Sequence, residues 1–120
     1  MEAIKQRERK RIEVIETAKK WASNLNFEAS VILIGSYARG DFNRWSDVDI
    51  LIISDVFKGN PIDRLRSIDP PPGFQVIPIN VREFENLRER GDVLVKEALR
   101  HGVILRDDLK LYRIFADKHS

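Results

Sequence analysis

Cysteine is absent from this 120-residue chain, and histidine occurs only at His101 and His119. Without cysteine the chain can form neither a disulfide nor a thiolate metal site, and two histidines cannot build a zinc cluster unaided. No apolar run approaches the roughly 18 residues of a membrane span, and the charged N-terminal stretch lacks the apolar centre of a secretion signal. These absences predict a soluble, cytoplasmic protein with no membrane segment.

An excess of charge of one sign is also missing, since the formal net charge is only +2. A value this small does not by itself indicate a protein that binds polyanions. Residues 5–11, KQRERKR, do hold five basic groups against one acid. Such a run is typical of a solvated helix face, and no aromatic residue interrupts it for base stacking. Binding of nucleic acid is therefore the least favoured interpretation.

The apolar pattern predicts one small domain over residues 1–120, because 42% of the residues are hydrophobic and one core can be built from them. Helical spacing predicts an N-terminal helix over about 4–25, ahead of a core over about 29–118. Strands are expected over 29–34, 48–54, 74–80 and 103–105, and helical segments over 62–68, 81–90, 93–101 and 109–118. This mixture predicts an α/β or α+β fold, with a sheet of about four strands and helices packed mainly on one face.

The stretch GSYARGDFNRWSDVDILII joins the first two expected strands and carries the polar residues of most interest. Gly35 and Ser36 come first, and Asp47 and Asp49 follow after ten intervening residues. Because side chains alternate along a strand, the two carboxylates face the same side and can converge on one hard cation. Magnesium usually completes its coordination with substrate phosphate oxygens, so two carboxylates suit a metal–nucleotide site.

The residues around the glycine–serine turn offer groups for the phosphates of such a nucleotide. Gly35 lets the backbone approach a ligand closely, and Ser36 supplies a hydroxyl and an N–H where the chain turns. Arg39 suits bidentate phosphate binding, but it is equally suited to pair with Asp41 on the surface. Trp45 is expected at the rim of the site.

These residues resemble the nucleotidyltransferases of the DNA polymerase beta superfamily, in particular the short group called minimal nucleotidyltransferases. Gly-Ser, ten residues and Asp-x-Asp form that family's signature, and FQVIPINVREFENL and KEALRHGVILRDD are similar to its later segments. The resemblance implies a nucleotidyltransferase-like mixed sheet and magnesium-dependent transfer of a nucleoside monophosphate, AMP from ATP, to a hydroxyl. Asp47 and Asp49 would be catalytic and bind metal, and Gly35, Ser36 and Arg39 would bind the nucleotide.

The resemblance also implies a partner, because members of this group often act beside a HEPN-family protein in a toxin–antitoxin pair. There the acceptor can be a protein tyrosine. The chain is too short to carry an obvious acceptor-binding domain of its own, which makes a partner or a homodimer reasonable.

The third acidic position of the superfamily is occupied here by Gln75. Glutamine carries no charge and cannot accept a proton at neutral pH, so metal affinity and general-base catalysis should both fall. Glu83, on the helix that follows, is a candidate substitute. The alternative function is therefore a catalytically weakened module that binds a nucleotide, or a partner as an antitoxin does.

Overall fold

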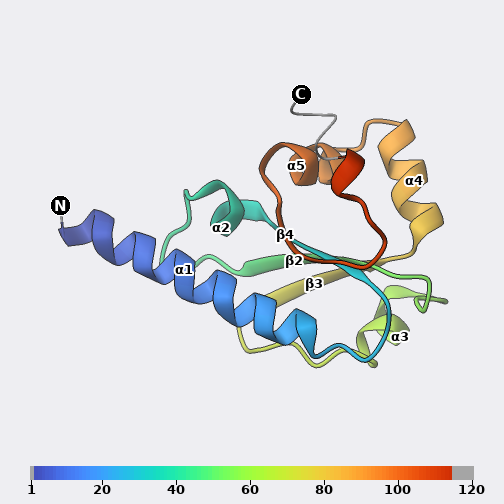
Figure 1. The fold of residues 1–120 in the computed structure, drawn as a ribbon, viewed down its shortest axis with the longest axis horizontal. Helices are drawn as coiled ribbons and strands as arrows, with labels where there is room; N and C mark the ends of the chain where they lie inside the picture. The colour runs from blue at the N-terminus through green and yellow to red at the C-terminus, as the bar shows by residue number, and fades with distance from the viewer. Residues whose placement is uncertain (1, 115–120) are drawn as a thin grey trace.

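The computed structural model describes residues 2–114. Along the chain lie α1 (Glu2–Ser23), β1 (Ser30–Ile34), α2 (Gly35–Arg39), β2 (Val48–Ile53), α3 (Pro61–Leu65), β3 (Phe74–Ile79), α4 (Val81–Glu89), α5 (Val93–His101) and β4 (Val103–Asp107). Figure 1 shows α1 running along the sheet, with α4 and α5 on its other side. None of the described helices is both long and apolar enough to span a membrane.

The four strands form one mixed sheet in the order β3-β2-β1-β4. β1 pairs with β2 and with β4 in antiparallel fashion, whereas β2 and β3 are parallel. The predicted four-stranded mixed sheet is therefore confirmed, with each strand within two residues of its expected bounds. Pro78 also fits, because β3 lies at an end of the strand order, where a missing backbone donor costs no ladder bond.

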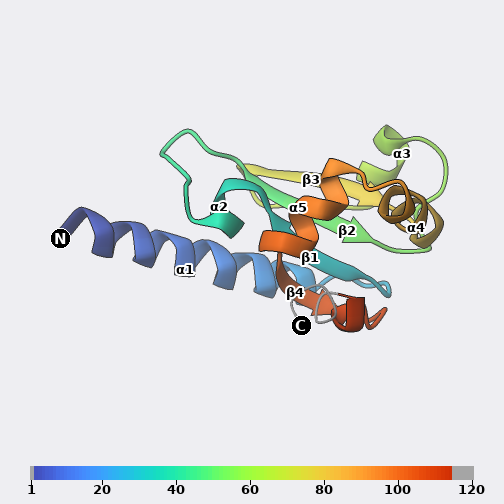
Figure 2. The same ribbon diagram turned by 90° about the horizontal axis from the view of Figure 1, so that it is seen from above.

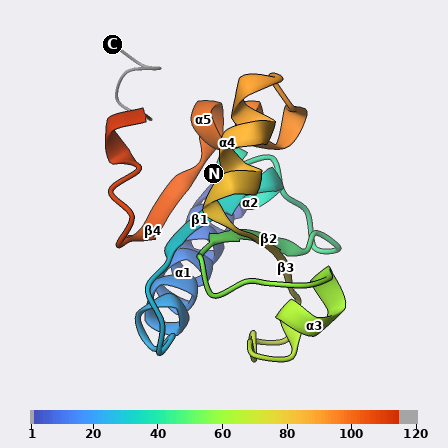
Figure 3. The same cartoon turned by 90° about the vertical axis from the view of Figure 1, so that its right-hand side faces the viewer.

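The helices cover both faces of the sheet, so the expectation that they pack mainly on one face is wrong. Alternate residues of β1 divide between two cores: Val31 and Leu33 pack with α1, whereas Ile32 and Ile34 pack with α4 and α5. Figure 3 shows α1 on one side of the sheet and these two helices on the other. The central strands are apolar on both faces, and such a run requires cover on both sides.

α1 packs on the sheet through its second half only. Val14, Ala18 and Ala22 are buried there. Helical spacing predicts that Ile12 lies on one apolar stripe with Ala18 and Ala22, but Ile12 is 55% exposed. The first half of the helix extends past the edge of the sheet, as Figure 2 shows from above. The expected bounds of 4–25 thus shift to Glu2–Ser23. Of the last predicted helix, 109–118, residues 112–114 are helical and residues 115–118 lie outside the described part.

Candidate functional site

The turn from β1 into α2 places Gly35 directly against Asp49 of β2. Ile34 is the antiparallel partner of Asp49, and Gly35 follows it with a φ of 75°. A Cβ atom added at Gly35 would lie 3.2 Å from the Asp49 Cγ and still closer to one carboxylate oxygen. Glycine is required at this position for two reasons: a side chain would strain the backbone, and it would occupy the space of the Asp49 carboxylate. The predicted close approach at Gly35 is thus toward an acid of the same site.

Asp49 is half-buried on β2, and Asp47 is exposed immediately before that strand begins. Burial raises the pKa of the Asp49 carboxyl above its ordinary value, the charge of Asp47 raises it further, and the charge of Arg39 opposes the rise. Two carboxylates therefore repel each other in a partly desolvated place. A cation between them would relieve this repulsion, so the donor set fits a hard divalent metal.

Arg39, at the end of α2, is held by two acids. Its Nε donates to Asp41 Oδ2 at 3.1 Å, and its Nη1 pairs with Glu97 of α5. The surface pairing with Asp41, left open against phosphate binding, is thus formed in the structure. Arg39 also lies close enough to Asp49 to influence the pKa of its carboxyl. A phosphate that bound Arg39 would have to share it with, or take it from, these carboxylates.

α2 itself is fixed to the rest of the molecule from two sides. Tyr37 is buried and stacks on Phe42, with ring centroids 4.2 Å apart, so it packs in the core. Arg11 of α1 donates from Nε to the Tyr37 carbonyl at 2.8 Å and from Nη2 to the Ala38 carbonyl at 2.9 Å. The turn that carries Ser36 and Arg39 is therefore anchored on α1.

Sequence reasoning missed the roles of Arg11 and Glu97. Arg11 is one of five basic residues in the run 5–11, and nothing in the sequence distinguishes it from the others. Glu97 is 58 residues from Arg39 along the chain, and no spacing rule connects two such positions.

Gln75 lies beside Asp49, because β2 and β3 pair in parallel register with Asp49 opposite Gln75. Paired residues on neighbouring strands share a face of the sheet, so the amide is on the same face as the carboxylate. A cavity of about 380 Å³ opens next to it, lined by Leu65, Pro70, Phe74, Gln75, Val76 and Ile77. The larger hollow of about 720 Å³ lies elsewhere, between α1 and α2.

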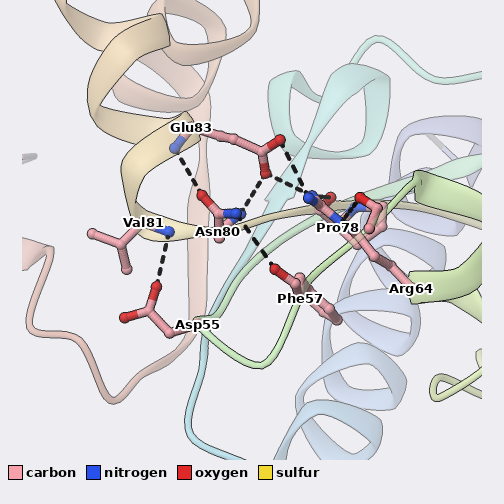
Figure 4. Close-up of polar contacts among 8 residues, drawn as sticks. Asp55, Phe57, Arg64, Pro78, Asn80, Val81 and Glu83 are labelled. Atoms are coloured by element: carbon pink, nitrogen blue, oxygen red, sulfur yellow. Dashed lines mark hydrogen bonds and ion pairs between the residues drawn. The ribbon is translucent and has the colours of Figure 1, made fainter.

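Glu83 does not reach this place and cannot substitute for the missing acid. It lies beyond the far end of β3, where Ile79 pairs with Ile53, roughly 13 Å along the sheet from the Asp49 pair. There it accepts from Arg64 at 2.6 Å and closes the capping box of α4 with Asn80 (Figure 4). These contacts lower the pKa of Glu83, with the hydrogen bond from Arg64 as the largest cause. Its role is structural.

Within residues 2–114, no group of three or more histidine, cysteine, aspartate or glutamate side chains is arranged to hold a metal. The candidate site therefore offers Asp47 and Asp49 without a full cage. This is the arrangement expected when a substrate's phosphate oxygens supply the remaining ligands. Trp45 lies near these acids in the sequence and is 82% exposed, which agrees with a rim position.

The profile of the nucleotidyltransferase domain matches residues 12–118, most of the chain. This protein belongs to the nucleotidyltransferase family. The match begins inside α1 and includes every strand and the whole candidate site.

Individual relatives agree with this assignment. A segment of 26 residues is 65% identical to the Methanocaldococcus jannaschii protein named "Putative protein adenylyltransferase MJ0604". This segment spans 22% of the chain and 26% of that relative's length.

Three crystal structures share the fold. The first is described as a "putative nucleotidyltransferase from Sulfolobus solfataricus" and has a TM-score of 0.53 at 23% identity. The similarity covers 87% of this chain and 86% of that chain. A toxin–antitoxin complex with AMP-PNP has a TM-score of 0.54 at 20% identity, covering 87% and 82%. A toxin–antitoxin MntA–HpeT mutant, with two aspartates two positions apart changed to glutamate, gives 0.53 at 18% with the same coverage.

Proposed function

We propose that this protein transfers AMP from ATP to a hydroxyl group of an acceptor protein, in a magnesium-dependent reaction that releases pyrophosphate. The observation that carries the proposal is the position of Asp49: a half-buried carboxylate with Gly35 against it, Asp47 two residues before it and Gln75 in register beside it. Two further findings support it, the family of the chain and its short, 65% identical match to a relative named as a protein adenylyltransferase.

Asp47 and Asp49 would hold the metal, and the turn after β1 would bind the triphosphate. When bound, Mg²⁺ offsets the charge of the triphosphate and polarises the α-phosphate. Ser36 would donate its hydroxyl and N–H to the outgoing phosphates, and the glycine before it leaves room for them to approach. Catalysis of this kind rests on positioning and charge, because the attacking hydroxyl and the leaving pyrophosphate must lie in line.

The acceptor hydroxyl has no carboxylate base at the third position. A positioned general base contributes on the order of 10²–10⁴-fold to rate. Gln75 can accept a hydrogen bond from the hydroxyl but cannot take its proton. Transfer should therefore be slow compared with that of an enzyme bearing an acid at this position.

The partner we propose is a HEPN-type toxin, whose tyrosine or other hydroxyl receives the AMP. Two structures with this fold come from toxin–antitoxin complexes, one of them with AMP-PNP. A homodimer is the alternative assembly, and we place nucleic acid last because the basic run lacks exposed aromatic residues.

The direct test is incubation of the protein with ATP labelled at the α-phosphate, Mg²⁺ and a HEPN-type protein. The proposal predicts label in the partner that is lost in an Asp47→Asn/Asp49→Asn variant and kept in Asp63→Asn, which makes the same change on the exposed surface of α3. Label that is unaffected by the double change would contradict it.

A weakened module that binds nucleotide with little or no transfer is the second candidate, favoured by the register of Gln75 with Asp49. Here saturable binding of ATP would be found without label in any partner. Gln75→Glu separates the two candidates further, since a third carboxylate should raise metal affinity and restore a base. If this variant gains neither metal affinity nor transfer, Gln75 does not belong to the site.

A further inference from the structure

The largest of the hollows described lies between the exposed half of α1 and the end of α2, and neither Asp47 nor Asp49 lines it. It has a volume of about 720 Å³, and Ile4 and Arg7 of α1 and Arg39, Gly40 and Phe42 of the opposite wall line it. Arg7 lies over the Phe42 ring, 5.6 Å from its centre. We call this hollow the α1–α2 groove. Figure 2 shows that α1 continues past α2.

Two of the cations that line the groove have no acidic partner. Arg7 and Arg11 form no salt bridge with any acidic side chain in the described part of the chain, whereas Arg39 is paired with Asp41 and Glu97. Arg11 donates to two neutral carbonyls, which leaves its charge uncompensated. Glu8 is the one acid that lines the groove within residues 2–114. An anionic ligand would therefore gain from Arg7 and Arg11 together.

The groove also has an exposed apolar side chain, and this distinguishes between kinds of anionic ligand. Ile4 lines the groove and is 61% exposed, although burial of an isoleucine side chain is favourable. A phosphate backbone offers no apolar surface that would bury it. Phe42 is 6% exposed and cannot stack on a base. The combination of the exposed Ile4 with Arg7 and Arg11 fits a protein segment better than a nucleic acid.

A second copy of the chain is a poor occupant for this groove. Symmetric contact would bring residues 5–11 of one copy, with five cations and one acid, against the same residues of the other or against the arginines of the groove. Such juxtaposition of like charges opposes association.

We propose that the α1–α2 groove is the docking surface for an acidic amphipathic segment of a partner protein, with apolar side chains against Ile4 and acidic ones toward Arg7 and Arg11. Arg39 lines the groove and also acts on the Asp49 carboxyl, so a docked partner would lie next to the candidate site. The inference concerns recognition alone and does not require that AMP is transferred.

The test uses a fluorescein-labelled, 18-residue helical peptide with leucines along one face and glutamates on the other. Its control has lysine in place of each glutamate. Binding to the full chain is measured by fluorescence anisotropy, and the site is located from amide shifts in an ¹⁵N-labelled sample, which a 14.0 kDa protein permits. We expect saturable binding of the acidic peptide only, with the largest shifts at Ile4, Gly40 and Phe42.

Two charge reversals on the same helix give a matched pair. Arg7→Glu acts inside the groove and should weaken binding at least tenfold. Arg9→Glu makes the same change at a neighbouring exposed position that does not line the groove, and should weaken it less than threefold. Ile4→Ser should weaken it severalfold without changing the charge. Far-ultraviolet circular dichroism verifies that each variant keeps its helices.

Three results would overturn the proposal. The acidic peptide fails to bind, both arginine variants weaken it equally, or a single-stranded RNA 15-mer binds more tightly and loses affinity in Arg7→Glu. The last result would make the groove a nucleic-acid site. Labelling of a partner from ATP enters none of these readouts, so this inference and the proposed function can fail independently.

Discussion

Asp49 is the residue on which the interpretation of the site depends, because it combines burial, a neighbouring acid and a contact with the glycine turn. A raised pKa for an acid means that its charged form is disfavoured in the folded protein. Stability is therefore lost as the pH rises from the ordinary pKa of aspartate through the raised folded value. Such a cost is typical of functional sites, where a ligand compensates for it.

We predict that Asp49→Asn stabilises the metal-free protein at neutral pH by about 0.5–2 kcal/mol. The variant removes a charge that is disfavoured in the folded protein, so the gain should shrink as the pH falls through the raised pKa of Asp49 and should vanish below the ordinary pKa of aspartate. Thermal unfolding at several pH values measures this, with Asp63→Asn as the neutral control. Destabilisation at pH 7 would show that the charge is compensated within the chain.

Gly35 permits a second prediction, because Gly40 offers a comparison with the same backbone requirement. Both have positive φ, 75° and 92°, but a Cβ at Gly40 meets nothing within 4 Å, whereas one at Gly35 meets Asp49. Gly40→Ala should cost about 1–2 kcal/mol from backbone strain alone. Gly35→Ala should cost more and should also weaken binding of Mg²⁺ and ATP. Equal effects of the two changes on stability and binding would refute the close approach.

At the scale of elements, α4 and α3 are joined by a partly buried ion pair. Arg64 is buried, with 7% of its side chain exposed, and it donates to Glu83 and to the carbonyl oxygens of Gly59 and Pro78. Since Glu83 also closes the α4 capping box, the start of this helix and α3 are coupled.

Glu83→Gln should destabilise the protein by about 1–3 kcal/mol near neutral pH, because Arg64 loses its charged partner while glutamine can still close the capping box. The pKa of Glu83 is lowered, so its contribution is fully present above the ordinary value of 4.5 and is lost as the pH falls through the folded value. Wild type and variant should converge there in denaturant unfolding. Glu85→Gln, on the exposed side of α4, should have no such effect.

α1 and α2 give the other prediction at this scale. Arg11→Lys keeps the charge but cannot reach two carbonyls with a planar fork, so α2 should become less rigidly held. We expect weaker nucleotide binding, by about threefold to tenfold, with a stability loss of about 0.5–1.5 kcal/mol for the lost hydrogen bonds. Calorimetric titration with a non-hydrolysable ATP analogue measures the first, with Arg9→Lys as control. Unchanged affinity would show that the anchor is structural only.

Much of this element pattern could be predicted from the sequence, for local reasons. Strands such as Val48–Ile53 are continuous apolar runs, and the caps at Asn80 and Asp92 are polar residues ahead of helical spacing. The faces that the helices cover could not be predicted, because an apolar run does not reveal which helix covers it. The prediction that Ile12 is buried was wrong for a related reason, since a helix can extend beyond the sheet on which it packs.

At the scale of the whole molecule, the candidate site results from the sheet order. Placing β2 between β1 and β3 brings the Gly35 turn, Asp49 and Gln75 side by side, although 40 residues separate the first from the last. The spacing of glycine, serine and aspartates predicted that the turn and Asp49 lie together, whereas Gln75 was placed beside them only by the resemblance to the superfamily. The long-range contacts of Arg39 with Glu97 and of Arg11 with α2 were not predictable, because they depend on how the helices cross.

The most direct test of the central claim is calorimetric titration of the purified chain with a non-hydrolysable ATP analogue, with and without Mg²⁺. We predict one saturable site that requires Mg²⁺ and whose affinity falls at least a hundredfold in Asp47→Asn/Asp49→Asn, while Asp63→Asn binds like wild type. Binding that is equally tight without Mg²⁺, or unchanged in the double variant, would contradict the claim that these two carboxylates hold a metal–nucleotide complex.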